Sequence, residues 1–85
     1  MLIFDRDDEA LALANDTDYG LLVSLWTREA ERQRYFVRRL EVGVMTINSA
    51  SAISHRTPWG GFKQSGIGWR YGEMGLESFL EVKTV

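Results

Sequence analysis

Leu21-Leu22-Val23-Ser24-Leu25-Trp26 is the stretch that decides the fold of this chain, because Ser24 is its only polar residue. A short, nearly continuous apolar run is typical of a β-strand that is covered on both faces. A second run, Val44-Met45-Thr46-Ile47, is rich in β-branched residues and predicts another such strand. Strands covered on both faces belong to parallel sheets, so the two runs indicate an α/β arrangement.

A helix is expected between these two runs. Thr27 is suited to cap it, Glu29 and Glu31 complement the helix dipole in its first turn, and Gly43 is suited to end it. The apolar stripe expected to face the sheet consists of Ala30, Phe36, Val37 and Leu40. A strand, a helix and a second strand in this order predict a right-handed crossover between parallel strands.

The flanking segments extend this pattern. Residues 2–4 are a short apolar run suited to the end of a strand, and residues 8–15 predict a helix with an acidic first turn. Residues 48–57 are small and polar and predict a long loop, whereas residues 77–85 alternate and predict a strand with one polar face. The expected fold is therefore α/β, part of an open, mostly parallel sheet with flanking helices and a terminal β-strand.

Length and charge limit the possible functions. At 85 residues the chain is long enough for one small, marginally stable domain. Its net charge of -2 provides no general attraction for nucleic acid, so no nucleic-acid partner is expected. The basic cluster lies among acidic residues and is interpreted as a solvated helix face; its members are Arg32, Arg34, Arg38 and Arg39.

Cysteine and histidine counts restrict the chemistry further. With no cysteine, these 85 residues contain no disulfide, no thiolate nucleophile and no thiolate metal site, and a single histidine argues against an imidazole metal centre. The first residues lack a signal-peptide pattern, and no window reaches the ~18 apolar residues that a membrane span needs. A cytoplasmic location without a membrane partner is therefore expected.

The carboxyl half is rich in glycine, which raises the question of nucleotide binding. Gly61 and Gly66 have the spacing of a phosphate loop, but Ile67 and Gly68 stand where lysine and a hydroxyl residue are required. The run from Gly66 to Gly72 misses the dinucleotide fingerprint by one residue. A structural role for these glycines is favoured over a free-standing nucleotide-binding domain.

Two further residues attract attention in the same region. His55 has no partner in the sequence pattern that would orient it as a base, so a solvated loop histidine is the favoured interpretation. Trp59 lies between a proline and two glycines, and a large aromatic on a rigid turn is either a core residue or the wall of a pocket. The residues alone leave both roles open for Trp59.

Four blocks in order resemble the aldehyde dehydrogenase family. They are residues 14–21 (ANDTDYGL) with Trp26-Thr27, residues 39–48 (RLEVGVMTIN), residues 58–68 (PWGGFKQSGIG) and the ending at residues 81–85 (EVKTV). Together they cover almost the whole chain at the family's spacing. One departure stands out, because Trp69-Arg70 replaces the Arg-Glu that commonly follows the third block in relatives.

The resemblance implies a place in a larger enzyme. Residues 1–76 are expected to be the carboxy-terminal part of a catalytic domain that begins upstream, and residues 77–85 an oligomerisation strand that pairs with a neighbouring subunit. The family's aldehyde pocket borders the loop before the Pro-aromatic-Gly-Gly turn, which implies that Trp59 lines the pocket, with Ile53 as its neighbour. The expected partners are the rest of an aldehyde dehydrogenase or another copy of the chain.

The resemblance also implies a reaction. In the family a cysteine thiolate attacks the aldehyde, hydride passes to NAD or NADP, and a water activated by a glutamate releases the acid. Neither nucleophile nor base, nor any cofactor-binding residue, matches a position in this chain, so the isolated chain is expected to be inactive. The alternative is a non-catalytic interaction module that associates through its terminal strand.

Overall fold

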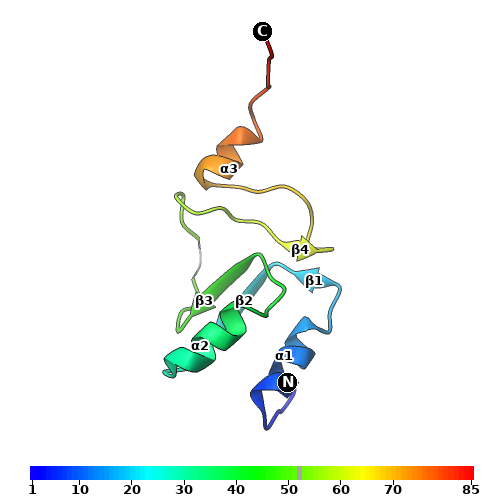
Figure 1. Cartoon of the computed structure of the whole chain (residues 1–85), viewed down its shortest axis with the longest axis vertical. Helices are drawn as coiled ribbons and strands as arrows, with labels where there is room; N and C mark the ends of the chain where they lie inside the picture. The colour runs from blue at the N-terminus through cyan, green and yellow to red at the C-terminus, as the bar shows by residue number, and fades with distance from the viewer. Residues whose placement is uncertain (52) are drawn as a thin grey trace.

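The computed structural model describes residues 1–51 and 53–85, which form three helices and two small sheets (Figure 1). The elements in chain order are α1 (Asp7–Asn15), β1 (Tyr19–Gly20), β2 (Leu22–Leu25), α2 (Ala30–Val37), β3 (Val44–Ile47), β4 (Phe62–Lys63) and α3 (Gly72–Glu77). The chain measures 58 × 25 × 22 Å, and its carboxyl end points away from the sheets along the longest dimension (Figure 1).

The two apolar runs pair in parallel, as predicted. Val23 lies opposite Met45 in the register of β2 and β3, and Leu25 lies opposite Ile47. We call β2, α2 and β3 the βαβ unit. Both α1 and α2 lie against one face of this sheet, because their side chains share a groove with Val23 and Leu25; the helical residues in that groove include Ala10, Ala14, Arg32 and Phe36.

The α/β class is confirmed, but the parallel sheet of the described residues has only two strands. The second sheet is antiparallel and joins β1 to β4, with Tyr19 opposite Lys63. Lys63 has a positive φ of 53° and its ammonium group donates to the carbonyls of Asn15 and Thr17 over 2.9 and 3.2 Å. These bonds hold the β4 turn against the end of α1, where unpaired carbonyl groups attract a cation.

Two predicted strands do not form among the described residues. Residues 2–4 and 78–85 both lie outside the strands of the two sheets, and Glu77 is the last residue of α3. An apolar run or an alternating pattern specifies a strand only where another strand supplies hydrogen bonds, and among the described residues neither segment has such a neighbour. In the single chain Glu77 therefore ends α3 and residues 78–85 follow it outside any strand, whereas pairing of residues 77–85 with a neighbouring subunit stays a prediction.

α2 is shorter than predicted at both ends. It begins at Ala30 rather than directly after Thr27, because the main chain of Thr27 bonds to Asn48 beyond β3. It ends at Val37 rather than near Gly43. Gly43 instead lets the main chain of Gly60 come close, because a Cβ atom on Gly43 would lie 1.8 Å from the carbonyl oxygen of Gly60. By contrast, α1 matches its prediction within one residue.

Burial is concentrated in the βαβ unit. Among the described residues Phe36 is the only buried large apolar side chain, at 5% exposure. The residues at the carboxyl end, 71–85, which we call the carboxyl arm, are mostly exposed, with Phe79 at 86% and Val82 at 95%. In the described part of the chain no helix is long and apolar enough to cross a bilayer. This amount of apolar exposure is typical of a surface that another protein surface covers.

Candidate functional site

Asn48 follows β3 directly and joins the carboxyl ends of β2 and β3. Its φ of 53° lies in the left-handed region, which asparagine tolerates better than most residues. The Thr27 N–H donates to its Oδ1 over 2.9 Å, and its Nδ2 donates to the Thr27 carbonyl over 3.0 Å. The Asn48 N–H also donates to the Leu25 carbonyl over 2.8 Å. Main chain and side chain of Asn48 therefore both bond the segment that ends β2.

A row of hydroxyl groups lies beside this junction. Thr46 is 9% exposed, and its Oγ1 lies 2.6 Å from the Ser49 carbonyl oxygen and 2.9 Å from Ser24 Oγ. Because a carbonyl oxygen only accepts, Thr46 donates to Ser49 and Ser24 donates to Thr46. The Ser51 N–H then donates to Ser49 Oγ over 3.2 Å. These bonds connect both strands to the start of the loop at residues 49–57.

The far end of this loop is fixed by the turn that follows it. Trp59 and Arg70 exchange two main-chain hydrogen bonds, each of 2.7 Å. The Gly72 N–H donates to the carbonyl of His55 over 3.0 Å. Ligands of open α/β sheets bind beyond the carboxyl ends of parallel strands, which is where this loop begins. The described residues of the loop between β3 and Trp59 are therefore the candidate functional site.

Trp59 is half-buried and borders a groove of about 280 Å³. The rest of the lining is Leu21, Gly60, Gly61, Ser65, Gly66, Ile67, Gly68 and Arg70. Among the described residues, Ile53 does not belong to this lining, and its side chain is 67% exposed. The structure thus places the two predicted site residues on one loop and its following turn but does not bring them into one groove.

The glycine-rich stretch around this groove serves turns and close contacts. A Cβ atom on Gly60 would lie 2.6 Å from the ring of Trp69. The ring of Trp69, which departs from the family's usual residue, therefore packs against the main chain of Gly60. Gly66 and Gly68 have φ values of 119° and 87° and open space around them. α3 follows with only six residues. The described glycines of this stretch therefore serve turns and close approaches of the main chain.

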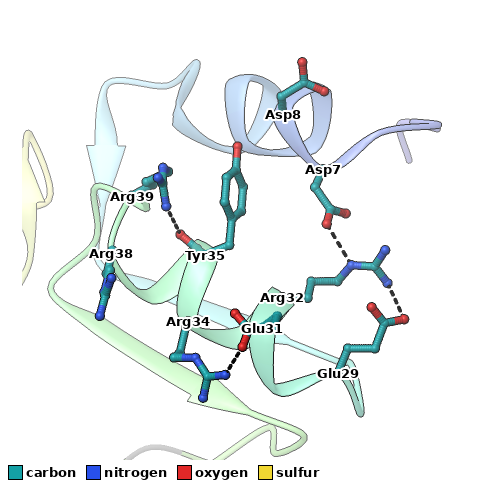
Figure 2. Close-up of a pocket in the computed structure, with 9 residues that line it drawn as sticks. All are labelled: Asp7, Asp8, Glu29, Glu31, Arg32, Arg34, Tyr35, Arg38 and Arg39. Atoms are coloured by element: carbon teal, nitrogen blue, oxygen red, sulfur yellow. Dashed lines mark hydrogen bonds and ion pairs between the residues drawn. The ribbon is translucent and has the colours of Figure 1, made fainter.

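The arginine cluster of α2 lies over an open groove of about 690 Å³ between α1 and α2 (Figure 2). Arg32 donates to Asp7 over 2.8 Å and to Glu29 over 3.2 Å, and Arg34 pairs with Glu31. The hydrogen bond to Asp7, followed by the negative charges of Asp7 and Glu29, raises the pKa of Arg32. These arginines are therefore neutralised by nearby carboxylates.

The remaining arginines of this groove lie at the end of α2. The Arg39 guanidinium lies 4.4 Å from the centre of the Tyr35 ring, a cation–π distance, and donates to the Tyr35 carbonyl over 3.3 Å. Like Arg39, Arg38 is exposed at the groove (Figure 2). The cluster is thus a solvated helix face, as predicted, and exposed pairs of this kind contribute little to stability.

Metal-ligating side chains are scattered. No group of three or more histidine, cysteine, aspartate or glutamate side chains in residues 1–51 and 53–85 is placed to hold a metal ion. His55 contributes its main-chain carbonyl to the bond with Gly72, and its side chain is exposed. The structured features of the site are therefore the Asn48 junction, the hydroxyl row and the Trp59 groove.

A family profile and individual relatives both match this chain and name the same family. The aldehyde dehydrogenase family profile matches residues 1–85. Betaine aldehyde dehydrogenase of Bacillus subtilis is 42% identical over 82 residues, which are 96% of this chain and 17% of that protein. A probable NADP(+) succinate-semialdehyde dehydrogenase of Synechocystis is 43% identical over 81 residues, 95% of this chain and 18% of that protein.

A solved structure shares the fold of this chain and part of its sequence. An oxidoreductase from Marinobacter aquaeolei superimposes with a TM-score of 0.93 and 35% identity, over 100% of this chain and 18% of that one. The chain spans less than a fifth of the length of each of these three proteins. It belongs to the aldehyde dehydrogenase family.

Proposed function

We propose that this chain is the carboxy-terminal segment of an NAD(P)-dependent aldehyde dehydrogenase, and that it supplies one wall of the aldehyde pocket. The observation that carries the proposal is the loop at residues 49–57, which starts at the carboxyl edge of β2 and β3 and ends at the groove of Trp59. Both loop ends are fixed by hydrogen bonds. A fixed loop beside a half-buried aromatic is suited to shaping a pocket for a small organic substrate.

The reaction proposed for the whole enzyme is oxidation of an aldehyde to a carboxylic acid. Its covalent step needs a thiolate, and these 85 residues contain no cysteine. The glycine-rich stretch lacks the residue pattern of a phosphate loop or a dinucleotide fingerprint, so the proposed contribution of the chain is to bind and orient the aldehyde. The nucleophile, the base and the NAD or NADP site are assigned to the rest of the enzyme.

The substrate is proposed as a class only. Two relatives of nearly equal similarity are named for betaine aldehyde, a cation, and for succinate semialdehyde, an anion. Identity over this segment therefore does not distinguish the charge of the substrate. Trp59 is the residue we assign to the pocket wall, and Ile53, on the exposed part of the same loop, is proposed as its neighbour once the rest of the enzyme covers it.

The proposed partners are the rest of the dehydrogenase and a second copy of the chain. The carboxyl arm exposes its apolar residues, among them Phe79 and Val82, and has no strand beside it among the described residues. An alternating segment with free peptide groups is a template for pairing with another chain. The same observation supports the second candidate function, a non-catalytic module that associates through this arm.

A graft tests the pocket assignment. In the grafted dehydrogenase, residues 1–85 replace the matching segment of the Bacillus subtilis enzyme, and NADH formation is followed with betaine aldehyde. We expect activity from the graft and none from the isolated 85-residue chain. Trp59→Ala removes the proposed wall and should raise KM for the aldehyde about tenfold, since burying an aromatic contributes about 1.5–3 kcal/mol.

The control for this graft is Trp69→Phe, which keeps an aromatic ring over Gly60 outside the proposed wall. It should leave KM for the aldehyde unchanged. An unchanged KM in Trp59→Ala would remove Trp59 from the pocket, and an inactive but folded graft would favour the interaction module.

A further inference from the structure

The start of the loop at residues 49–57 is held by a side chain rather than by the strand ladder alone. The last main-chain bond between the strands runs from the Asn48 N–H to Leu25. Beyond it, the carboxamide of Asn48 bonds both the N–H and the carbonyl of Thr27, two residues after the end of β2. One carboxamide therefore takes the place of an additional pair of ladder bonds and determines where the loop leaves the sheet.

A second asparagine makes the same kind of junction elsewhere. Asn15 donates from Nδ2 to the Arg39 carbonyl over 3.0 Å, and its Oδ1 accepts from the Glu41 N–H over 3.0 Å. It joins the end of α1 to the segment after α2, and among the described residues its side chain has no hydrogen bond to the loop at residues 49–57. The two junctions have equal hydrogen bonding and different positions, so each is the natural control for the other.

We propose that Asn48 is a positioning residue for the aldehyde pocket. Its carboxamide fixes the start of the loop, and the hydroxyl of Thr46 fixes the next residue, Ser49. Asn48 acts through Trp59 and Ile53 and does not touch the aldehyde itself. The inference rests on the proposed function, because only a pocket bordered by this loop gives the junction an effect on substrate binding.

The left-handed backbone of Asn48 decides which substitutions are informative. Alanine would add backbone strain at a φ of 53°, whereas Asn48→Gly tolerates this conformation, removes the side chain with its carboxamide and adds backbone freedom. Asn48→Asp keeps the acceptor for the Thr27 N–H and loses the donor to its carbonyl. Asn15→Ala is the matched control, because Asn15 ends a helix and alanine is compatible with that position.

Hydrogen exchange on the full 85-residue chain gives the first readout. In Asn48→Gly the peptide that covers residues 48–57 should exchange about tenfold faster than in the unaltered chain, since two hydrogen bonds that hold it are lost. Asn15→Ala should leave that peptide unchanged and accelerate exchange at residues 39–41. Equal exchange at residues 48–57 in Asn48→Gly and the unaltered chain overturns the inference, and so does a loop that is unprotected in both.

Kinetics of the grafted dehydrogenase give the second readout. Asn48→Gly should raise KM for the aldehyde about tenfold and change kcat by less than about twofold, because loss of ground-state positioning weakens binding and leaves the reacting groups in place. Asn48→Asp should give an intermediate KM, and Asn15→Ala an unchanged one. A purely structural role would lower the yield of active enzyme equally for Asn48→Gly and Asn15→Ala and leave KM unchanged in both.

The two readouts separate this inference from the proposed function. An active graft in which Asn48→Gly leaves KM unchanged refutes the positioning role and leaves the pocket assignment standing. A folded graft that is inactive even without substitution refutes the pocket assignment, and hydrogen exchange then still decides whether Asn48 holds the loop.

Discussion

The βαβ unit and the carboxyl arm differ in how far along the sequence their hydrogen bonds reach. In the unit, Ser24 bonds Thr46 across 22 residues, and Thr27 bonds Asn48 across 21. The start of the arm has one distant bond, from the Gly72 N–H to His55, but further along the bonds are local: the side chain of Ser78 bonds Gly75, and the Leu80 N–H bonds Glu77. The conformation of the unit is therefore held by bonds between distant parts of this chain, whereas the arm's end has only local bonds among the described residues, and we propose that a partner orders it.

Burial shows the same division. Phe36 of α2 is buried beside a groove that Val23 and Leu25 of β2 also line, whereas the apolar side chains of the arm are open to solvent. Folding of the unit removes apolar surface from water within one chain. For the arm, that gain comes only on contact with a second surface. The difference predicts that substitutions in the unit change stability and substitutions in the arm change association.

Removing the buried side chain of the unit should have the largest effect. We expect Phe36→Ala to lower the free energy of unfolding of the grafted dehydrogenase by about 3 kcal/mol, which is the lower end of the usual loss for replacing a buried phenylalanine with alanine. Urea unfolding followed by circular dichroism measures it. Val37→Ala, on the exposed side of the same helix, should cost less than about 1 kcal/mol. Equal losses for both variants would mean that the unit has no core of its own.

A proline in the arm should have a smaller and different effect. Val82→Pro removes one N–H donor and should weaken self-association of the chain about tenfold, because a paired strand cannot include a proline in its ladder. Light scattering at several concentrations measures the association, and Val82→Thr is the control that keeps a β-branched residue and the N–H. A chain that stays monomeric at all concentrations would contradict pairing through the arm.

The smallest expected effect is electrostatic and lies in α1. The hydrogen bond from Arg6 is the main cause of the lowered pKa of Asp8. A lowered folded-state pKa stabilises the fold above the ordinary value of 3.8, and this contribution is lost as the pH falls through the folded-state pKa. Arg6→Gln should raise the pKa of Asp8 toward 3.8 in an NMR titration. Arg34→Gln, which lies elsewhere in the groove of Figure 2, should leave it unchanged.

The sequence predicted the parts of the fold that depend on local pattern. β3 was expected at residues 44–47 and α1 at residues 8–15, because β-branched runs and acidic helix starts are local signals. The ends of α2 were not predicted, because Thr27 and Gly43 are used by distant partners, Asn48 and Gly60. β4 and α3 were missed, because two and six residues give too little periodicity.

The candidate site was predicted in part. A tryptophan between proline and glycine predicts either a core residue or a pocket wall, and only the family resemblance favours the pocket. The structure places Trp59 at a groove, and its role in an aldehyde pocket stays a prediction. The role of Asn48 was missed, although a signal existed in an asparagine directly after a β-branched run, where a left-handed residue ends a strand. The contact of Trp69 with Gly60 was not predictable, because it depends on two turns meeting in space.

The most direct test of the pocket assignment is a crystal structure of the grafted dehydrogenase with its aldehyde bound. We predict that the Trp59 ring lies within about 4 Å of the aldehyde, in van der Waals contact, and that residues 49–57 border the same pocket. An aldehyde bound elsewhere, with Trp59 covered by other side chains, would contradict the assignment of this chain to the pocket wall.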